Sequence, residues 1–280
     1  MTRTDRVRAT TYVGLAVISA VTVLPPAWIL LTSLKTGPEV YTYPPSLLPG
    51  TMYFGNYRQA IQEYGIGSAA LNSLFVSSSA TLLILIIGAL AAYSHSKFRY
   101  IGNTTLFLLA LLLRMVPPIT VLIPLYNLGK SIGLINTLYW LVLVNVAFNL
   151  PTAIWIFKVF FDQLPQELFD AARIDGCGNA GIFARIVVPL SRGSIGVVTI
   201  LMFVAVWNEF LMARTFAFGS EARMLPAALE PLLGVGVDVV GVHWGHVAAA
   251  ATIIILPLVP IAVFFQRYLI AGMMGGAMKT

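Results

Sequence analysis

Long apolar stretches separated by short polar segments recur along the whole chain. A helix needs about 20 mainly apolar residues to cross the roughly 30 Å hydrocarbon core of a bilayer. Six ranges reach this length and predict transmembrane helices at about 11–34, 69–93, 104–125, 137–161, 194–212 and 246–270. The alternating pattern of membrane β-strands is not present. The sequence therefore predicts an all-α polytopic membrane protein that forms one transmembrane domain over residues 1–280.

The composition narrows the class of protein further. Hydrophobic residues make up 58% of the 280 positions and charged residues only 10%, whereas an ordinary soluble domain is about 25% charged. This argues against a soluble enzyme, a disordered protein and a nucleic-acid binder. A single cysteine, Cys177, excludes a disulfide framework and a cysteine-rich metal site.

The positive charges orient the predicted spans. If the N-terminus is in the cytoplasm, most of the 17 Lys and Arg residues fall in cytoplasmic segments. Short cytoplasmic loops of membrane proteins carry such an excess of positive charge. Both termini are therefore predicted to be cytoplasmic, and the net charge of +6 needs no nucleic-acid partner. Kinks are expected where proline interrupts a span, because proline lacks a backbone donor: Pro25, Pro26, Pro117, Pro118, Pro151, Pro257 and Pro260.

The longest predicted cytoplasmic segment covers residues 162–192. Pro165 is suited to start a helix, with Glu167 and Asp170 in the first turns, and the glycines at 176 and 178 permit a sharp reversal. A second helical run, residues 180–187, is expected to end before Pro189. The segment therefore predicts a helix–turn–helix at the membrane surface. It either presents a surface to another protein or is an interfacial hairpin without a partner.

This segment resembles the EAA loop of ABC importer permeases. The pattern is Glu-Ala-Ala, three residues, Gly, nine residues, Ile, one residue and Leu-Pro, with Asp in place of Glu and Val in place of Leu here. The matching positions are Asp170, Ala171, Ala172, Gly176, Ile186, Val188 and Pro189.

The resemblance extends over nearly the whole chain and is to the MalG-like, maltose-type sugar permeases. Further matching stretches include Met115-Val-Pro-Pro118, Trp207-Asn-Glu-Phe210 and the tail at 271–279. The resemblance implies a type I importer permease fold in the cytoplasmic membrane of a bacterium or archaeon. It implies partnership with a homologous second permease (a heterodimer), two ATPase subunits and an extracytoplasmic solute-binding protein, with a sugar as substrate.

In that family the acidic residue of the EAA helix pairs with a basic side chain in a cleft of the ATPase. Asp170 would take this role, the alanines would allow close packing and Gly176 would make the turn. The candidate ATPase-coupling residues are Glu167, Asp170, Ala171, Ala172, Asp175, Gly176, Ile186 and Pro189. The chain itself is expected to be non-catalytic, with ATP and magnesium on the partner, because Pro124 stands where a phosphate loop ending at Ser131 requires glycine.

Polar residues within the predicted spans are the candidate substrate pathway. Placing the charge of Arg114 at the membrane centre costs free energy, so this side chain would face either the pathway or a partner such as the second permease. Asn145 and Asn149 would bind sugar hydroxyls or join helices. Trp207, Asn208 and Glu209 combine an aromatic surface with polar groups, which suits sugar binding and also an interfacial aromatic belt. A metal site is not predicted, because His243 and His246 have no third ligand.

Two other functions compete with this hypothesis. A self-sufficient secondary carrier would need a buried acid for ion coupling, for which Glu209 is the candidate. An intramembrane enzyme would need a nucleophile with a base, and the serines at 77–79 have neither a histidine nor a carboxylate near them in the spans. Residues 35–67 and 218–245 are candidate outer loops for docking a binding protein.

Overall fold

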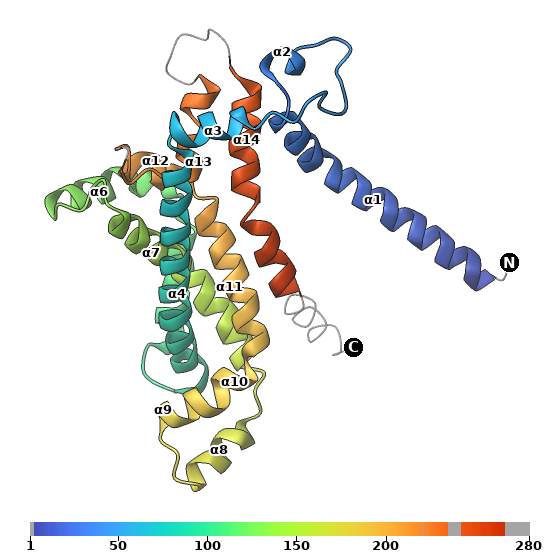
Figure 1. Cartoon of the computed structure of the whole chain (residues 1–280). Coiled ribbons are helices and arrows are strands. Elements are labelled where there is room, and N and C mark those ends of the chain that lie inside the picture. The colour runs from blue at the N-terminus through green and yellow to red at the C-terminus, as the bar shows by residue number, and fades with distance from the viewer. Residues whose placement is uncertain (1–2, 220, 235–241, 267–280) are drawn as a thin grey trace. The chain divides into compact units, whose positions relative to one another are not determined.

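Helices are the only regular elements in the residues that the computed structural model describes, which are 3–219, 221–234 and 242–266 (Figure 1). The all-α prediction is confirmed for these ranges. The chain divides into two units, Met1–Ser68 with Ala228–Pro257 and Ala69–Ala227 with Leu258–Thr280. The end of the sixth predicted span and the tail at 271–279 lie outside the described residues.

The first unit consists of the N-terminal helix and segments from both ends of the chain. Its helices are α1 (Arg3–Ser33), α2 (Gly37–Val40), α3 (Gly55–Gln62), the 3₁₀ turn η2 (Pro231–Leu233) and α14 (Trp244–Ile255). Both α1 and α3 pack against α14. Helix α1 continues through Pro25 and Pro26, so these prolines do not end it.

The second unit contains the remaining helices. They are α4 (Ile66–Lys97, in this unit from Ala69), α5 (Asn103–Arg114), α6 (Pro118–Ser131), α7 (Leu138–Phe161), α8 (Gln166–Ile174), α9 (Asn179–Ile182), the π-helix η1 (Phe183–Val187), α10 (Val188–Leu190), α11 (Arg192–Trp207), α12 (Leu211–Phe216) and α13 (Leu225–Ala228, up to Ala227).

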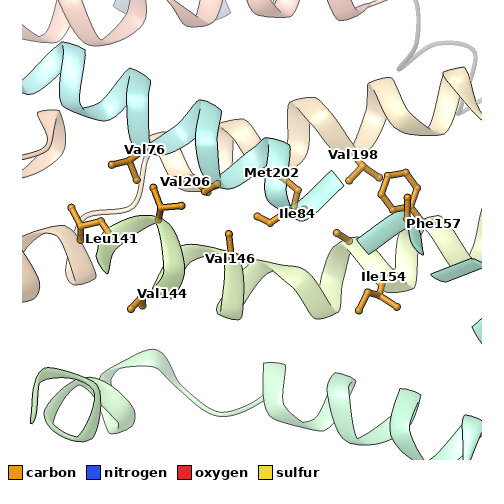
Figure 2. Close-up of a cluster of buried hydrophobic side chains, with 14 of the residues drawn as sticks. Val76, Ile84, Leu141, Val144, Val146, Ile154, Phe157, Val198, Met202 and Val206 are labelled. Atoms are coloured by element: carbon orange, nitrogen blue, oxygen red, sulfur yellow. The ribbon is translucent and has the colours of Figure 1, made fainter. Parts of the chain in front are cut away.

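The core of this unit lies between α4, α7 and α11. Figure 2 shows Val76 and Ile84 of α4, Leu141 and Phe157 of α7 and Met202 of α11 among its buried side chains. These helices are apolar on more than one face, as expected of helices that pack in a bundle and also face lipid. The core therefore gives the second unit a framework that can hold the segment after α7, which the sequence predicts to be cytoplasmic.

The third predicted span, 104–125, is not one continuous helix. Helix α5 ends at Arg114 and α6 begins at Pro118, and the two are bent by 97°. Pro117 and Pro118 lie at this break, and a proline disfavours helical backbone in the residue before it. The sequence predicted a kink at these prolines, and the structure has a near right angle instead.

Four helices among the described residues are long and apolar enough to cross a membrane, and two bent pairs of helices meet the same criterion when each pair is taken together. The long ones are Thr11–Ser33, Ile66–Lys97, Leu138–Phe161 and Trp244–Gln266, and the bent pairs are Asn103–Arg114 with Pro118–Ser131 and Asn179–Leu190 with Arg192–Trp207. The fifth predicted span, 194–212, ends earlier than expected, since α11 stops at Trp207. The described helices reach six candidate spans only if each bent pair counts as one span. The first member of the second pair, Asn179–Leu190, lies in the segment predicted to be cytoplasmic rather than in the predicted fifth span.

Candidate functional site

The segment that the sequence predicts to be cytoplasmic folds as a hairpin of short helices, α8 to α10. We call residues 166–190 the coupling hairpin, after the role that the resemblance implies for them. Pro165 is the N-cap of α8, and Glu167 lies in the first turn. A carboxylate at this position interacts favourably with the positive end of the helix dipole. The predicted helix start is therefore confirmed.

Helix α8 ends in a Schellman motif centred on Gly176. The backbone φ of Gly176 is +82°, in the region that residues with a Cβ avoid. The Cys177 amide donates to the Ala172 carbonyl at 2.9 Å, and the Gly176 amide donates to the Arg173 carbonyl at 3.0 Å. These two bonds satisfy carbonyls that the end of the helix would otherwise leave free. Gly176 thus makes the turn that its place in the motif predicted.

The two faces of α8 have different environments. Phe169 and Ala172 are buried, with 1% and 7% of their surface exposed, whereas Asp170, Ala171 and Ile174 are exposed. Ala171 is therefore open to a partner, and the role predicted for the two alanines in close packing stays a prediction. Ala172 packs within its own chain, because residues three apart share one face of a helix and Phe169 directs that face to the core.

Asp170 is free to change partners. Its Oδ1 accepts from Arg173 at 3.3 Å and from Gln166 at 3.2 Å, and both side chains of the ion pair are about half exposed. An exposed pair of this kind contributes little to stability, about 0–1 kcal/mol. Asp175 is also exposed and caps the C-terminus of α8. The carboxylate of Asp170 is therefore available to a basic group on another protein.

The C-terminal end of α4 holds the base of the coupling hairpin. Lys97 Nζ lies 4.4 Å from the centre of the Phe169 ring and donates to the Leu164 carbonyl at 3.1 Å. Ser96 Oγ donates to Asp162 Oδ1 at 2.6 Å. We call these contacts the α4 clasp.

The α4 clasp also reaches the end of α7, since Lys158 of α7 pairs with Asp162 at 2.6 Å. The contacts of Lys97 and Lys158 were not predicted from the sequence. One feature of the sequence could have indicated these contacts: Asp162 is an acidic residue close to the ends of predicted spans that carry lysines.

The second arm of the hairpin departs from the sequence prediction. The helical run was expected to end before Pro189, but it continues through η1 and α10 to Leu190. A proline cannot donate the helical hydrogen bond, and its ring clashes with the carbonyl four residues earlier. The wider π-helical turn at 183–187 precedes Pro189, and such turns accommodate a local break in the α pattern. Ile186 and Pro189 are both half-buried here.

The two asparagines of α7 bond along their own helix. The Asn145 amide donates to the Leu141 carbonyl and the Asn149 amide to the Asn145 carbonyl, both at 2.9 Å. Both side chains are buried, and Asn145 Oδ1 has no partner among the described residues. Their amide nitrogens therefore bond within α7 rather than to another helix, and contact of these residues with a sugar stays a prediction.

Arg114 lies at the break between α5 and α6. Its side chain is exposed and forms no hydrogen bond or ion pair with any described residue. It lines an otherwise apolar cavity of about 230 Å³, together with Val121, Leu125, Phe148 and others. The guanidinium is thus exposed at the wall of this cavity.

Trp207, at the end of α11, and the two residues that follow it form contacts with nearby residues of their own chain. Glu209 accepts from the Met212 and Ala213 amides at 2.8 and 2.9 Å, so its carboxylate caps the N-terminus of α12. The Asn208 amide donates to the Val204 carbonyl at 2.9 Å. Trp207 is buried and stacks on Phe203, with ring centres 5.7 Å apart. These contacts give all three residues a structural role.

The described residues contain no group of three His, Cys, Asp or Glu side chains arranged to hold a metal ion. The coupling hairpin, with an accessible acid on one face and an anchored aromatic on the other, is the region best organised for contact with another protein.

Comparison with known proteins places this hairpin in a family. The model of the binding-protein-dependent transport system inner membrane component matches residues 84–275, which include the whole hairpin. A crystal structure of a bacterial ABC transporter involved in the import of the acidic polysaccharide alginate shares the fold. Its TM-score is 0.80 over 96% of this chain and 98% of that chain, at 20% identity.

Several curated relatives match over nearly their full length. SugB, a trehalose transport system permease protein of Mycobacterium tuberculosis (strain CDC 1551 / Oshkosh), is 33% identical over 91% of this chain and 92% of its own. MalG, a trehalose/maltose transport system permease protein of Thermococcus litoralis, is 30% identical over 95% of both chains. MelC, a melibiose/raffinose/stachyose import permease protein of Bacillus subtilis (strain 168), is 30% identical over 99% and 98%. The chain therefore belongs to the family of binding-protein-dependent transport system inner membrane components, the multi-pass permease subunits of ABC importers.

Proposed function

We propose that this chain is one of two permease subunits of an ATP-driven sugar importer. Its relatives named for trehalose, maltose and raffinose transport support a sugar as the solute. The importer would contain a homologous second permease, two ATPase subunits that bind ATP and magnesium, and an extracytoplasmic solute-binding protein. The chain itself would be a single non-catalytic transmembrane domain of six spans, with both termini in the cytoplasm.

The two-faced α8 is the observation that supports coupling through the hairpin. An ATPase that binds the exposed face would meet the Asp170 carboxylate, and the small side chain of Ala171 would permit close approach. Charge-assisted hydrogen bonds to a carboxylate are stronger than neutral ones. Because the Arg173–Asp170 pair is exposed and weak, exchanging Arg173 for a basic group of the ATPase costs little.

The α4 clasp supports a route from the hairpin into the membrane helices. The Lys97 ammonium of α4 packs on the face of the Phe169 ring, so a displacement of α8 by the ATPase would act on the end of α4. Asp162 connects the same region to α7 through Lys158. ATP-driven closure would thus shift the balance between outward-open and inward-open states, provided that ATP binds the two states with different affinities.

Replacing Asp170 tests the coupling directly. We expect Asp170→Lys to abolish uptake of radiolabelled sugar and binding of the ATPase, because a cation would face the basic partner. Asp170→Glu is the matched control: it keeps the charge on a longer side chain, and uptake should persist. Both proteins must be present in the membrane at equal amounts, measured by immunoblot. Normal uptake with Asp170→Lys would overturn the coupling role.

The alternative of a secondary carrier predicts a different dependence on energy. Glu209, its candidate ion-coupling acid, already accepts two backbone amides, which favours the importer. Uptake measured after deletion of the ATPase gene separates the two functions. We expect no uptake in that strain, and a carrier would continue to transport.

A further inference from the structure

The first unit contains a hollow of about 310 Å³ that no part of the proposed coupling mechanism uses. It lies where the segments around α2 and α3 meet the start of α14. The side chains that matter for its chemistry are Tyr41, Tyr53, Gln59, Glu63, Trp244 and His246. We call it the outer hollow, because the predicted topology places it at the extracytoplasmic end of the spans.

The walls of the outer hollow are fixed by long-range contacts. The buried Asn56 amide donates to the Ser33 and Lys35 carbonyls at 2.9 and 2.8 Å. Gly245 approaches Asn56 so closely that a Cβ on this glycine would lie 2.8 Å from the amide. Tyr41 donates its hydroxyl hydrogen to the Val242 carbonyl. The hollow is therefore a built feature of the unit.

The polar groups of the hollow can still bind a ligand. Gln59 Oε1 hydrogen-bonds His246 Nε2, while the Gln59 amide nitrogen has no partner among the described residues. The Glu63 carboxylate is exposed and accepts no hydrogen bond from them. An amide donor thus lies in the same hollow as a carboxylate acceptor. A hydroxyl group, which both donates and accepts, can use both.

Aromatic surfaces complete the lining. Trp244 is 50% exposed and Tyr53 is 40% exposed. Amphipathic aromatic rings bury the apolar face of a ligand while leaving its edges to polar groups. Lysine and arginine are not among the residues that line the hollow, whose basic groups are the imidazoles of His243 and His246. The Glu63 carboxylate in the same lining repels an anionic ligand. The combination selects a neutral ligand with one apolar face and many hydroxyl groups.

We propose that the outer hollow binds a neutral sugar ring, stacked on Trp244 and hydrogen-bonded by Gln59 and Glu63. The volume is at the lower limit of small-molecule pockets, about 300 Å³, which suits one ring of a larger saccharide. Sugar binding here follows from the lining of the hollow. Its use as a first contact during import rests on the proposed function.

Saturation-transfer NMR on the assembled importer in lipid nanodiscs tests the site. The sample contains trehalose but neither the solute-binding protein nor ATP, so the readout does not depend on transport. We expect saturation of the sugar protons in the wild type and a Kd weaker by about tenfold or more in Trp244→Ala, since this variant loses both the aromatic stack and the apolar area that the ring buries. Glucuronate, an anionic sugar, should bind more weakly than trehalose because Glu63 repels it.

Trp155→Ala is the matched control. Trp155 on α7 is also 50% exposed but does not line the hollow, so trehalose binding should be unchanged. Glu63→Gln changes an exposed group without a hydrogen-bond partner and should fold normally, with affinity lowered severalfold. Equal binding by the wild type, Trp244→Ala and Glu63→Gln would overturn the proposal, as would the absence of any saturation in the wild type.

The same variants separate this proposal from two other results. If Trp244→Ala weakened capture of the purified solute-binding protein while trehalose gave no saturation, the hollow would be a protein-docking site and the proposal would be wrong. If Asp170→Lys retained uptake while trehalose binding still required Trp244, the sugar site would stand and the proposed coupling would fall.

Discussion

The coupling hairpin and the outer hollow are both polar regions at the ends of apolar helices, but they are assembled in different ways. The hairpin is one continuous stretch, residues 166–190. The outer hollow joins side chains far apart in the chain, such as Gln59 and His246, which are 187 positions apart. The first is visible as a sequence motif. The second exists only when α3 and α14 pack together.

Glycine illustrates the difference between the two regions. Gly176 in the hairpin is required by its own backbone, since its φ is +82° and a Cβ there would meet nothing within 4 Å. Gly245 at the outer hollow has no such dihedral and is required by its neighbour Asn56. Local geometry thus determines one glycine, and long-range packing determines the other. The following substitutions test this distinction, in order of decreasing effect.

The largest effect is expected from Phe169→Ala. The variant empties a fully buried site between the coupling hairpin and the core, and such truncations cost about 3–5 kcal/mol. The thermal unfolding midpoint of the purified permease complex should fall, and uptake should be lost. Leu168→Ala, the neighbouring residue on an exposed face, should change stability by about 0.5 kcal/mol or less. Equal destabilisation by the two variants would show that α8 is not anchored through Phe169.

Gly245→Ala should follow. The added Cβ would lie 2.8 Å from the Asn56 side chain, which cannot easily move because it bonds two carbonyls. Overpacking of this kind costs about 1–3 kcal/mol, measurable as a lower unfolding midpoint. The control is Gly14→Ala in α1, where a Cβ meets nothing within 4 Å and alanine should be neutral or slightly stabilising. An unchanged midpoint for Gly245→Ala would contradict the close packing of α3 on α14.

Gly176→Val should cost about 1–2 kcal/mol because a residue with a Cβ is strained at positive φ. The Schellman turn would open, and ATPase co-purification and sugar uptake should both be lost. Gly178→Val is the comparison, since Gly178 has an extended backbone with φ −73° and room for a side chain. It should leave the unfolding midpoint nearly unchanged. A similar fall in the midpoint for both would mean that the turn does not depend on the dihedral of Gly176.

Lys97→Met should give the smallest change, about 1 kcal/mol, since it removes one hydrogen bond and one cation–π contact at a half-buried position. We expect uptake to fall severalfold while ATPase binding persists, because the α4 clasp acts after docking. Lys130→Met changes an exposed lysine on α6 and should leave uptake unchanged. If Lys97→Met transported at the wild-type rate, the clasp would have no part in transmission.

Much of the fold follows from local patterns. The predicted spans 69–93 and 137–161 lie within or almost coincide with α4 and α7, because hydropathy is a property of each segment by itself. The helix start at Pro165 and the turn at Gly176 were also predicted, since capping and positive φ are local requirements. The 97° bend after Arg114 and the continuation past Pro189 were not. A proline indicates a break without determining its angle or whether a π-turn absorbs it.

The sequence by itself determined that the chain consists of long apolar helices and that a helix begins at Pro165 and ends in a glycine turn at Gly176. These outcomes depend on contacts within a few residues. Tertiary structure decided which alanine of the motif is exposed, that Lys97 holds Phe169, that Glu209 caps α12, and that α3 and α14 enclose a hollow. Each of these depends on groups brought together by packing, whose partners no local pattern specifies.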